Sequence, residues 1–154
     1  MQTVLLAVDE TKGSLQTVEK MVELFSNCRP TNLVMVYVEK IEGKSLLDDL
    51  ILSESEMQTL KESLAGSEYQ KKMDEKAGKV VQYFSDALSN KGLPPNKVLI
   101  REGHPAEEIL KAAKDEDAEL IVVGSRSKRT RNLFMGSVSR EVANNAEISV
   151  LVVK

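Results

Sequence analysis

Five short apolar runs, separated by longer mixed segments, constrain the fold of this chain more than any other feature of its sequence. They are rich in β-branched residues and cover residues 3–8, 33–38, 97–101, 120–123 and 148–153. Apolar runs of this length are typical of strands that are buried on both faces, as the strands of a parallel sheet are. In the segments between them, apolar residues recur at the spacing of one helix face. The sequence therefore predicts strands that alternate with helices.

The predicted helices follow each of the first four strands. They are expected at about residues 14–27, with Ser14 as N-cap, and at about residues 68–90, 105–114 and 136–145. Residues 39–66 are less regular: a short helix is expected around residues 46–52, and Ser53 and Glu56 form a capping-box pattern that opens a helix through Leu64. Five strands that alternate with helices predict one doubly wound α/β domain over residues 1–154, with a parallel sheet and helices on both faces.

The charge balance and the cysteine count exclude several classes of protein. The chain has 154 residues, with 21 basic and 24 acidic side chains and a net charge of -3, so no general basic excess exists to hold a nucleic acid. Cys28 is the one cysteine, which rules out an internal disulfide and a cysteine metal cluster. The first residues lack a basic leader region, and no apolar run reaches membrane-spanning length. We expect a cytoplasmic protein that binds neither nucleic acid nor membrane.

The stretch over residues 119–139 carries the strongest indication of function. An apolar strand ends at Gly124, a basic loop follows, and a helix is predicted to start near Gly136. Backbone N–H groups at the start of a helix have no intrahelical partner, and the helix dipole makes this end attractive to anions. Gly136 would let a ligand approach the backbone closely, while Ser137 and Ser139 add hydroxyl groups. This stretch is therefore predicted to bind phosphate.

The strand ends indicate where the rest of the site lies. In a doubly wound sheet, ligands bind beyond the carboxyl ends of the strands, at the point where the strand order reverses. Asp9 follows the first predicted strand, and Gly124 follows the fourth. If these two strands are neighbours, both residues meet at that point and share one site.

The same stretch resembles the glycine motif of the universal stress protein family, in its nucleotide-binding branch. That branch carries glycine, two residues, glycine, nine residues, and then glycine followed by serine or threonine. The likeness extends over nearly the whole chain, including the strand ends at Asp9 and Val38, residues 103–109 and residues 148–153. The residues that stand at the motif positions here are Gly124, Ser127, Gly136, Ser137, Val138 and Ser139.

The resemblance implies the strand order 3-2-1-4-5, a homodimer paired through the last strands, and ATP, with or without Mg²⁺, bound by the motif. Asp9 would hydrogen-bond ribose hydroxyls or hold a metal that bridges to the phosphates; its simpler role is to cap the next turn. Val38 would line the adenine pocket and Gly103 would face the ligand, where a core residue and a plain turn are the simpler interpretations. The expected nucleotide-binding residues are Ala7, Asp9, Val38, Gly103, Val123, Gly124, Ser125, Arg126, Ser127, Gly136, Ser137, Val138 and Ser139.

The chain departs from the family motif at two places in the phosphate loop. Ser127 stands at the second glycine, and the gap that follows, residues 128–135, is one residue shorter than usual. A serine is strained at a position that needs a positive φ, unless the loop takes another path. We expect the basic side chains of the loop to compensate through charge-assisted hydrogen bonds to phosphate; the alternative is a solvated loop that touches no ligand. These side chains are Arg126, Lys128, Arg129 and Arg131.

Three functions remain open at this point. The first is a regulatory or stress-response protein whose ATP state tunes partners or assembly. The second is a dimeric interaction protein that binds no nucleotide, and the third is a slow ATP hydrolase or nucleotidyl transferase. Against catalysis, Asp9 is the one candidate general base near the predicted phosphate site, and the single histidine, His104, suits a helix entry better. The chain has neither a P-loop nor a Rossmann glycine fingerprint after its first strand.

Overall fold

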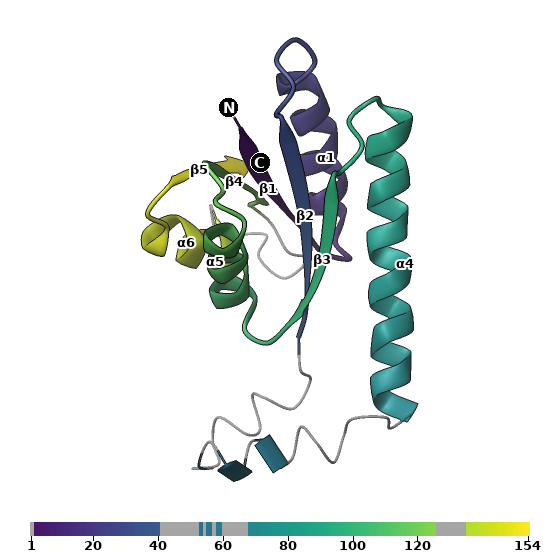
Figure 1. Cartoon of the computed structure of the whole chain (residues 1–154), viewed down its shortest axis with the longest axis vertical. Coiled ribbons are helices and arrows are strands. Elements are labelled where there is room, and N and C mark those ends of the chain that lie inside the picture. Colours follow the sequence, from purple (N-terminus) through teal and green to yellow (C-terminus); the bar gives the residue numbers. More distant parts are fainter. Residues whose placement is uncertain (1, 41–52, 54, 57, 60–67, 126–134) are drawn as a thin grey trace.

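A five-stranded sheet forms the centre of the computed structural model, which describes residues 2–40, 53, 55–56, 58–59, 68–125 and 135–154 (Figure 1). Every strand pairing is parallel, and the strand order is β3-β2-β1-β4-β5. The predicted doubly wound sheet and the order 3-2-1-4-5 are both confirmed. The strands are β1 Thr3–Val8, β2 Asn32–Glu39, β3 Lys97–Glu102, β4 Leu120–Gly124 and β5 Ser149–Val153.

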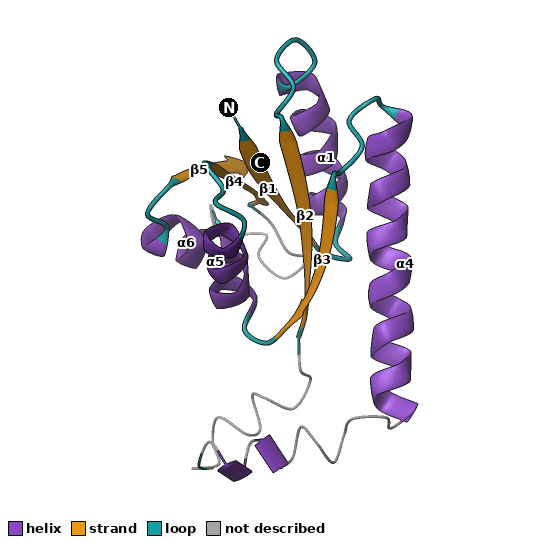
Figure 2. Cartoon of the chain, viewed as in Figure 1, coloured by secondary structure: helices purple, strands orange, loops and turns teal. Residues whose placement is uncertain are grey.

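Helices cover both faces of this sheet, as predicted. Helices α1 and α4 lie on one face, and α5 and α6 lie on the other (Figure 1 and Figure 2). His104 is the N-cap of α5 and Pro105 is its first residue, which matches the expected helix entry. None of the described helices combines the length and hydropathy that a membrane span requires. The helices are α1 Lys12–Leu24, α4 Glu68–Asn90, α5 Pro105–Asp115 and α6 Ser137–Asn145.

The start of α1 differs from the prediction in a way that affects the site. The N-cap is Thr11 and not Ser14, and the helix ends at Leu24, before the expected end near Asn27. Ser14 lies inside the first turn, where its hydroxyl accepts a hydrogen bond from the Asp9 N–H and donates one to Asp9 Oδ1, each 2.8 Å long. Because this hydroxyl is engaged by Asp9, it ties the end of β1 to α1 instead of capping the helix.

Part of the crossover between β2 and α4 can also be compared with the prediction. Ser53 and Glu56 form the expected capping box, since the Glu56 N–H donates to Ser53 Oγ at 3.4 Å and the Ser53 N–H donates to Glu56 Oε2 at 2.8 Å. The hydrogen bonds from Ser53, first from its N–H, hold the pKa of the Glu56 carboxyl below its ordinary value. The helix predicted around residues 46–52 and the helix end predicted at Leu64 lie outside the described residues.

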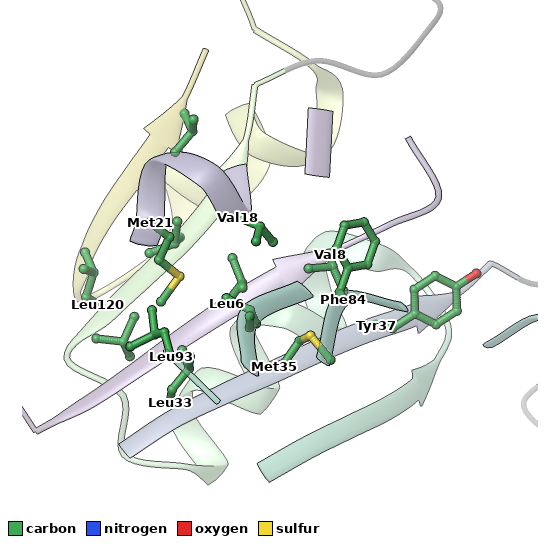
Figure 3. Packing of buried hydrophobic residues seen from close by; sticks show 14 of the residues in the cluster. Leu6, Val8, Val18, Met21, Leu33, Met35, Tyr37, Phe84, Leu93 and Leu120 are labelled. Carbon is green, nitrogen blue, oxygen red and sulfur yellow. The ribbon is translucent and has the colours of Figure 1, made fainter. Parts of the chain in front are cut away.

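Two apolar clusters hold the three layers together. Alternate residues of β1 divide between them: Val4, Leu6 and Val8 pack under α1 and α4, whereas Leu5 packs under α5 and α6. Figure 3 shows the first cluster, in which Phe84 of α4 lies against the strands. Because the central strands are buried on both faces, their sequences are continuous apolar runs and not alternating ones.

One charged side chain is buried beside this apolar interior. Glu39, the last residue of β2, is 4% exposed, and its Oε1 has no hydrogen-bond partner among the described residues. Burial raises the pKa of the Glu39 carboxyl, and the nearby charges of Asp74 and Glu102 raise it further. A buried carboxylate oxygen that lacks a hydrogen-bond partner destabilises the folded state when the group is ionised.

We therefore expect Glu39→Gln to raise the free energy of unfolding at neutral pH by on the order of 1 kcal/mol, because an unpaired amide is less costly to bury than an unpaired carboxylate. The folded protein keeps the Glu39 proton to a higher pH than the unfolded chain does. The wild type therefore loses stability as the pH rises through the raised pKa, and the gain in the variant should shrink toward zero at about pH 4. Urea unfolding at both pH values measures this gain. Glu75→Gln, on the exposed face of α4, is the control; a gain that is the same at both pH values would contradict the prediction.

The reversal of strand order falls between β1 and β4. The chain continues from β1 to β2 and β3 on one side of the sheet, and it returns to place β4 and β5 on the other side. Loops that leave the carboxyl ends of these two strands diverge and leave a crevice between them. This is the place where the sequence predicted Asp9 and Gly124 to meet.

Candidate functional site

A cavity of about 240 Å³ lies at the carboxyl end of the sheet, at the reversal of strand order. Its wall is built from the ends of β1, β2 and β4, the first turns of α1, α5 and α6, and one side of α4. Polar and apolar residues line different parts of this wall. The cavity therefore has the position and the mixed lining that are typical of ligand sites in open α/β sheets.

The N-terminus of α6 forms one end of the cavity. The helix begins at Ser137, so the N–H groups of Ser137, Val138 and Ser139 have no acceptor within the helix. The Gly136 N–H is already used, because it donates to the Ser125 carbonyl over 2.6 Å. The Ser139 hydroxyl donates to the Gly136 carbonyl over 3.1 Å and so stabilises the helix start. Three backbone N–H groups at the positive end of the helix dipole thus form an end of the cavity that favours an anion.

Ser125 adds a second feature at the same end. It follows β4 directly and is 1% exposed, and its Oγ has no hydrogen-bond partner among the described residues. Its backbone is held on both sides, since its N–H donates to the Val153 carbonyl over 2.7 Å and its carbonyl accepts from Gly136. A buried hydroxyl without a partner is costly, and this one belongs to the cavity wall. An oxygen-bearing ligand in the cavity would satisfy it.

Two glycines at this end are required by the packing of the chain itself. A Cβ at Gly136 would lie 3.1 Å from the Ser125 carbonyl oxygen, and a Cβ at Gly124 would lie 2.9 Å from Thr17 Oγ1. Neither glycine has a positive φ. From the sequence, Gly136 was expected to let a ligand approach the backbone, and Gly124 was expected to end the strand. The structure shows a second reason for glycine at each position. A side chain at Gly136 would press on Ser125, and a side chain at Gly124 would disturb the packing of α1 on β4.

Asp9 lies at the end of β1, where the cavity wall passes from β4 to β2. Its Oδ1 accepts hydrogen bonds from the Thr11 N–H at 2.9 Å, from the Thr11 hydroxyl, and from the Ser14 hydroxyl at 2.8 Å. One carboxylate oxygen therefore caps the following turn, as the simpler interpretation expected. No donor among the described residues bonds to Oδ2. Asp9 thus combines a fixed orientation with one oxygen that can accept from a ligand.

Glu10, Tyr37 and Lys76 form a network on the wall next to α4. Glu10 Oε1 accepts from Lys76 Nζ over 3.0 Å, and the Tyr37 hydroxyl donates to Glu10 Oε2 over 3.3 Å. Burial raises the pKa of Tyr37 and the adjacent Glu10 charge raises it further, so the hydroxyl stays protonated. Burial opposes ionisation of Glu10, but hydrogen bonds from its own backbone N–H and from Lys76 outweigh this effect and lower its pKa. The network therefore holds a negative carboxylate between two donors.

Charges of both signs surround the cavity. The carboxylates of Asp9 and Glu10 follow β1, while Lys40, Lys76 and Arg140 contribute cationic side chains to the lining. Arg140 belongs to α6, whereas Lys40 directly follows β2 and Lys76 belongs to α4. Because β1 lies between β2 and β4, the basic residues stand on both sides of the acidic centre. A phosphate would find its donors at the α6 end.

An apolar strip lies on the side of the cavity that faces α5. Val36 and Val38 of β2, Pro105 and Ile109 of α5, and Val138 of α6 line this part. All except Pro105 belong to the apolar cluster between the sheet and the two helices α5 and α6. A strip of this composition can bind a flat apolar ring, with polar groups at its margins to orient it.

Most of the residues that the sequence predicted come together in this cavity. Gly103 does not line it: this glycine makes a turn after β3 with φ of 141°, and its N–H donates to the Glu39 carbonyl over 3.1 Å. Arg126 and Ser127, with the rest of the basic loop, lie outside the described residues. The predicted residues that line the cavity are Ala7, Asp9, Val38, Val123, Gly124, Ser125, Gly136, Ser137, Val138 and Ser139.

The sequence did not predict the lining residues at the start of α1 or those on α4 and α5, and it also missed Val8, Glu10, Val36, Tyr37, Lys40 and Arg140. Thr11 lies two positions after Asp9, so its place just beyond the strand end could have indicated that it lines the cavity. Arg140 follows the last motif serine directly, which was a second such signal. Met73 and Lys76 offered none, because only the packing of α4 on the sheet brings them to the cavity.

Comparisons with known proteins agree with this architecture. A family profile, described as the universal stress protein family, matches residues 1–154. The universal stress protein in the QAH/OAS sulfhydrylase 3' region of Thermus aquaticus is 41% identical over 71 residues, which are 46% of this chain and 52% of that relative. Universal stress protein MJ0577 of Methanocaldococcus jannaschii is 27% identical over 138 residues, or 88% of this chain and 84% of that protein. The match therefore spans about half the length of the first relative and most of the second.

Solved structures share the fold over the full chain. The structure of MJ0577 superposes with a TM-score of 0.75 at 23% identity and covers 99% of this chain and 95% of that one. The universal stress protein of Archaeoglobus fulgidus in complex with dAMP superposes with a TM-score of 0.58 at 17% identity, over 100% of this chain and 98% of that one. At these identities the likeness establishes the fold.

Proposed function

The chain belongs to the universal stress protein family, and we propose that it is a nucleotide-dependent regulatory or stress-response factor that binds ATP in the cavity at the end of its sheet. In this proposal the phosphates lie at the N-terminus of α6 and the ribose lies near Asp9. The adenine ring lies against the apolar strip that includes Val36 and Val38. The bound nucleotide would tune a protein partner or the assembly of the protein.

One observation carries this proposal: the Ser125 hydroxyl, which has no hydrogen-bond partner among the described residues, and the α6 N–H groups that lack an intrahelical acceptor belong to the wall of the same cavity. Each feature alone has an ordinary explanation, since helix ends are often solvated. Together they are several donors around one cavity, at the positive end of a helix dipole, with no acceptor among the residues that the structure describes. Phosphate is the common biological anion that satisfies such an arrangement.

The relatives support the class of ligand and not its identity. The Archaeoglobus fulgidus structure was solved in complex with dAMP, which is an adenine nucleotide. That complex favours an adenine nucleotide for the cavity of this chain. The preference for ATP over a shorter nucleotide rests instead on the α6 N-terminus and on the basic side chains within residues 126–131.

Magnesium enters this proposal only together with the nucleotide. Within the described part of the chain, no three acidic, histidine or cysteine side chains are placed to hold a metal ion together. Mg²⁺ commonly binds through one or two carboxylates and the substrate phosphates, and Asp9 Oδ2 suits that mode. The same oxygen suits a ribose hydroxyl as an acceptor. Titrating ATP in Mg²⁺ and in EDTA separates the two roles, because only the metal role makes the effect of Asp9→Asn depend on Mg²⁺.

Titration calorimetry with ATP and AMP tests the proposed function. We expect ATP to bind more tightly than AMP, and the difference to shrink as ionic strength rises, because salt screens exposed charges. Changing Arg126, Lys128, Arg129 and Arg131 together to Gln should weaken ATP binding about tenfold or more, since a charge-assisted hydrogen bond contributes about 1.5–3 kcal/mol. If both nucleotides bind this variant as tightly as the wild type, the loop is a solvated connection. If neither binds the wild type, the protein is better described as an interaction protein without nucleotide.

The proposal also includes a homodimer that pairs along β5. This strand lies at the edge of the sheet, and its residues Val150, Leu151 and Val152 are only partly buried. An apolar edge strand favours pairing with a second chain, and closed two-fold pairing is the commonest outcome. Light scattering at micromolar concentration should give twice the chain mass of 17.1 kDa. A monomeric mass would count against this pairing.

A further inference from the structure

The wall of the cavity next to α4 takes no part in the phosphate and ribose contacts proposed above. Met73 and Lys76 lie three positions apart, so they share one side of α4, and both line the cavity. Lys76 pairs there with Glu10, which follows β1, and Glu10 also accepts a hydrogen bond from Tyr37 of β2. This wall therefore contains charged groups from separate elements that hold one another in place.

The Glu10 carboxylate is fixed but retains the capacity to accept further hydrogen bonds. Lys76 Nζ is 3.0 Å from Oε1, and the Tyr37 hydroxyl is 3.3 Å from Oε2. An ionised carboxylate offers about four acceptor positions, and these two bonds leave some of them unused. The side chains of Lys76 and Glu10 are 47% and 49% exposed, so a molecule in the cavity can reach both.

The rest of the site determines which part of a nucleotide would face this wall. Phosphates at α6 and a ribose near Asp9 place the base on the far side of β1, toward β2. Val38, which is only partly buried, supplies apolar surface for the ring at the end of β2, and α4 packs on the other face of the same strand. The polar edge of the base then lies on the side of Glu10 and Lys76.

We propose that Glu10 and Lys76 read the base of the bound nucleotide. The Glu10 carboxylate accepts a hydrogen bond from an exocyclic amino group, and the Lys76 ammonium group donates to the adjacent ring nitrogen. Adenine presents this donor and acceptor side by side, on N6 and N1. Hypoxanthine presents the reverse, a carbonyl oxygen and a ring N–H, so it opposes both protein groups. This inference rests on the proposed function, because it needs a nucleotide in the cavity.

Titration calorimetry with ATP and inosine triphosphate tests this inference. We expect the wild type to bind ATP at least about tenfold more tightly, because a site built to pair with polar groups rejects an analogue that leaves them unpaired. In Glu10→Gln the ratio should fall to within about threefold, since an amide can also donate to the hypoxanthine carbonyl. Lys76→Met should also lower the ratio of ATP affinity to inosine triphosphate affinity. Glu23→Gln, in the exposed Lys20–Glu23 pair of α1, is the matched control and should leave the ratio unchanged.

Several outcomes would overturn the inference, and they are distinguishable from failure of the proposed function. A wild type that binds both triphosphates equally overturns it, and so does a ratio that is unchanged in both Glu10→Gln and Lys76→Met. If Ser137→Asp abolishes ATP binding but Glu10→Gln leaves the ratio of ATP to inosine triphosphate affinity unchanged, the phosphate site is supported and only the base-reading role fails. If neither nucleotide binds the wild type, both proposals fail. Thermal unfolding checks that each variant folds, and Lys76→Met, at an exposed position, gives a separate result if Glu10→Gln is unstable.

Discussion

Replacing Gly136 by valine is expected to lower the affinity for ATP by at least about a hundredfold, which corresponds to about two lost charge-assisted hydrogen bonds of 1.5–3 kcal/mol each. A Cβ at this position would lie 3.1 Å from the Ser125 carbonyl oxygen and 3.6 Å from Ser139 Oγ. To relieve this contact, the 2.6 Å hydrogen bond from Gly136 to Ser125 must lengthen and the start of α6 must move. The N–H groups of Ser137 and Val138 move with it, away from the phosphate position. Titration calorimetry with ATP measures the loss.

A second variant separates the loss of ligand binding from damage to the fold. Ser137→Asp places a carboxylate on the exposed first residue of α6, where it interacts favourably with the helix dipole. Its melting temperature should therefore equal or exceed that of the wild type. Its ATP affinity should still fall, because the carboxylate repels the phosphate and competes for the same N–H groups. Unchanged ATP affinity in both Gly136→Val and Ser137→Asp would exclude the α6 N-terminus from the site.

Gly124→Ala is expected to lower the free energy of unfolding by about 1–3 kcal/mol, the usual range for overpacking a buried position. The added Cβ would lie 2.9 Å from Thr17 Oγ1 and 3.4 Å from the Gly13 carbonyl oxygen. Thr17 is fully buried, and its hydroxyl donates to that same carbonyl over 2.8 Å. It cannot turn away without losing a buried hydrogen bond. Helix α1 must therefore shift away from β4.

Two comparisons identify the cause of this destabilisation. Gly78→Ala changes the same residue type on the exposed side of α4, where a Cβ would meet nothing within 4 Å. It should raise the free energy of unfolding by about 0.5–1 kcal/mol, because glycine is unfavourable inside a helix. The double variant Gly124→Ala with Thr17→Ala should lose less than the sum of the single variants, since it removes the close contact. Denaturant unfolding measures all four changes, and strict additivity in the double variant would rule out this contact as the cause.

The fold could be predicted from the sequence because local pattern and burial agree in this chain. The apolar runs at residues 3–8 and 120–123 became β1 and β4, with a difference of at most one residue at either end. Burial on both faces leaves no polar alternation that could obscure such strands. The order of the strands could not be predicted from these patterns. It came from the family resemblance, since periodicity within a strand does not encode which strand lies beside it.

The site could be predicted only where it depends on local backbone geometry. The end of β4 and the start of α6 were identified because a strand end and a helix start have recognisable residues. Lys76 was not identified, because it stands 66 positions from Glu10 and no local spacing marks the side of a long helix that faces a cavity. Gly103 is the opposite case, a residue that was predicted to face the ligand but does not line the cavity. Its φ of 141° requires glycine whether or not a ligand is near, so the residue type indicated a turn and not a contact.

The central claim is that a nucleotide binds between the end of β1 and the start of α6. NMR of the backbone amides during a titration with ATP tests this claim most directly, because each N–H reports on its own surroundings. We predict the largest shift changes at Ser125, Ser137, Val138 and Ser139, and no change at Gly78 on the exposed side of α4. Amides that stay unchanged at millimolar ATP, or changes confined to residues outside the cavity, would contradict the claim.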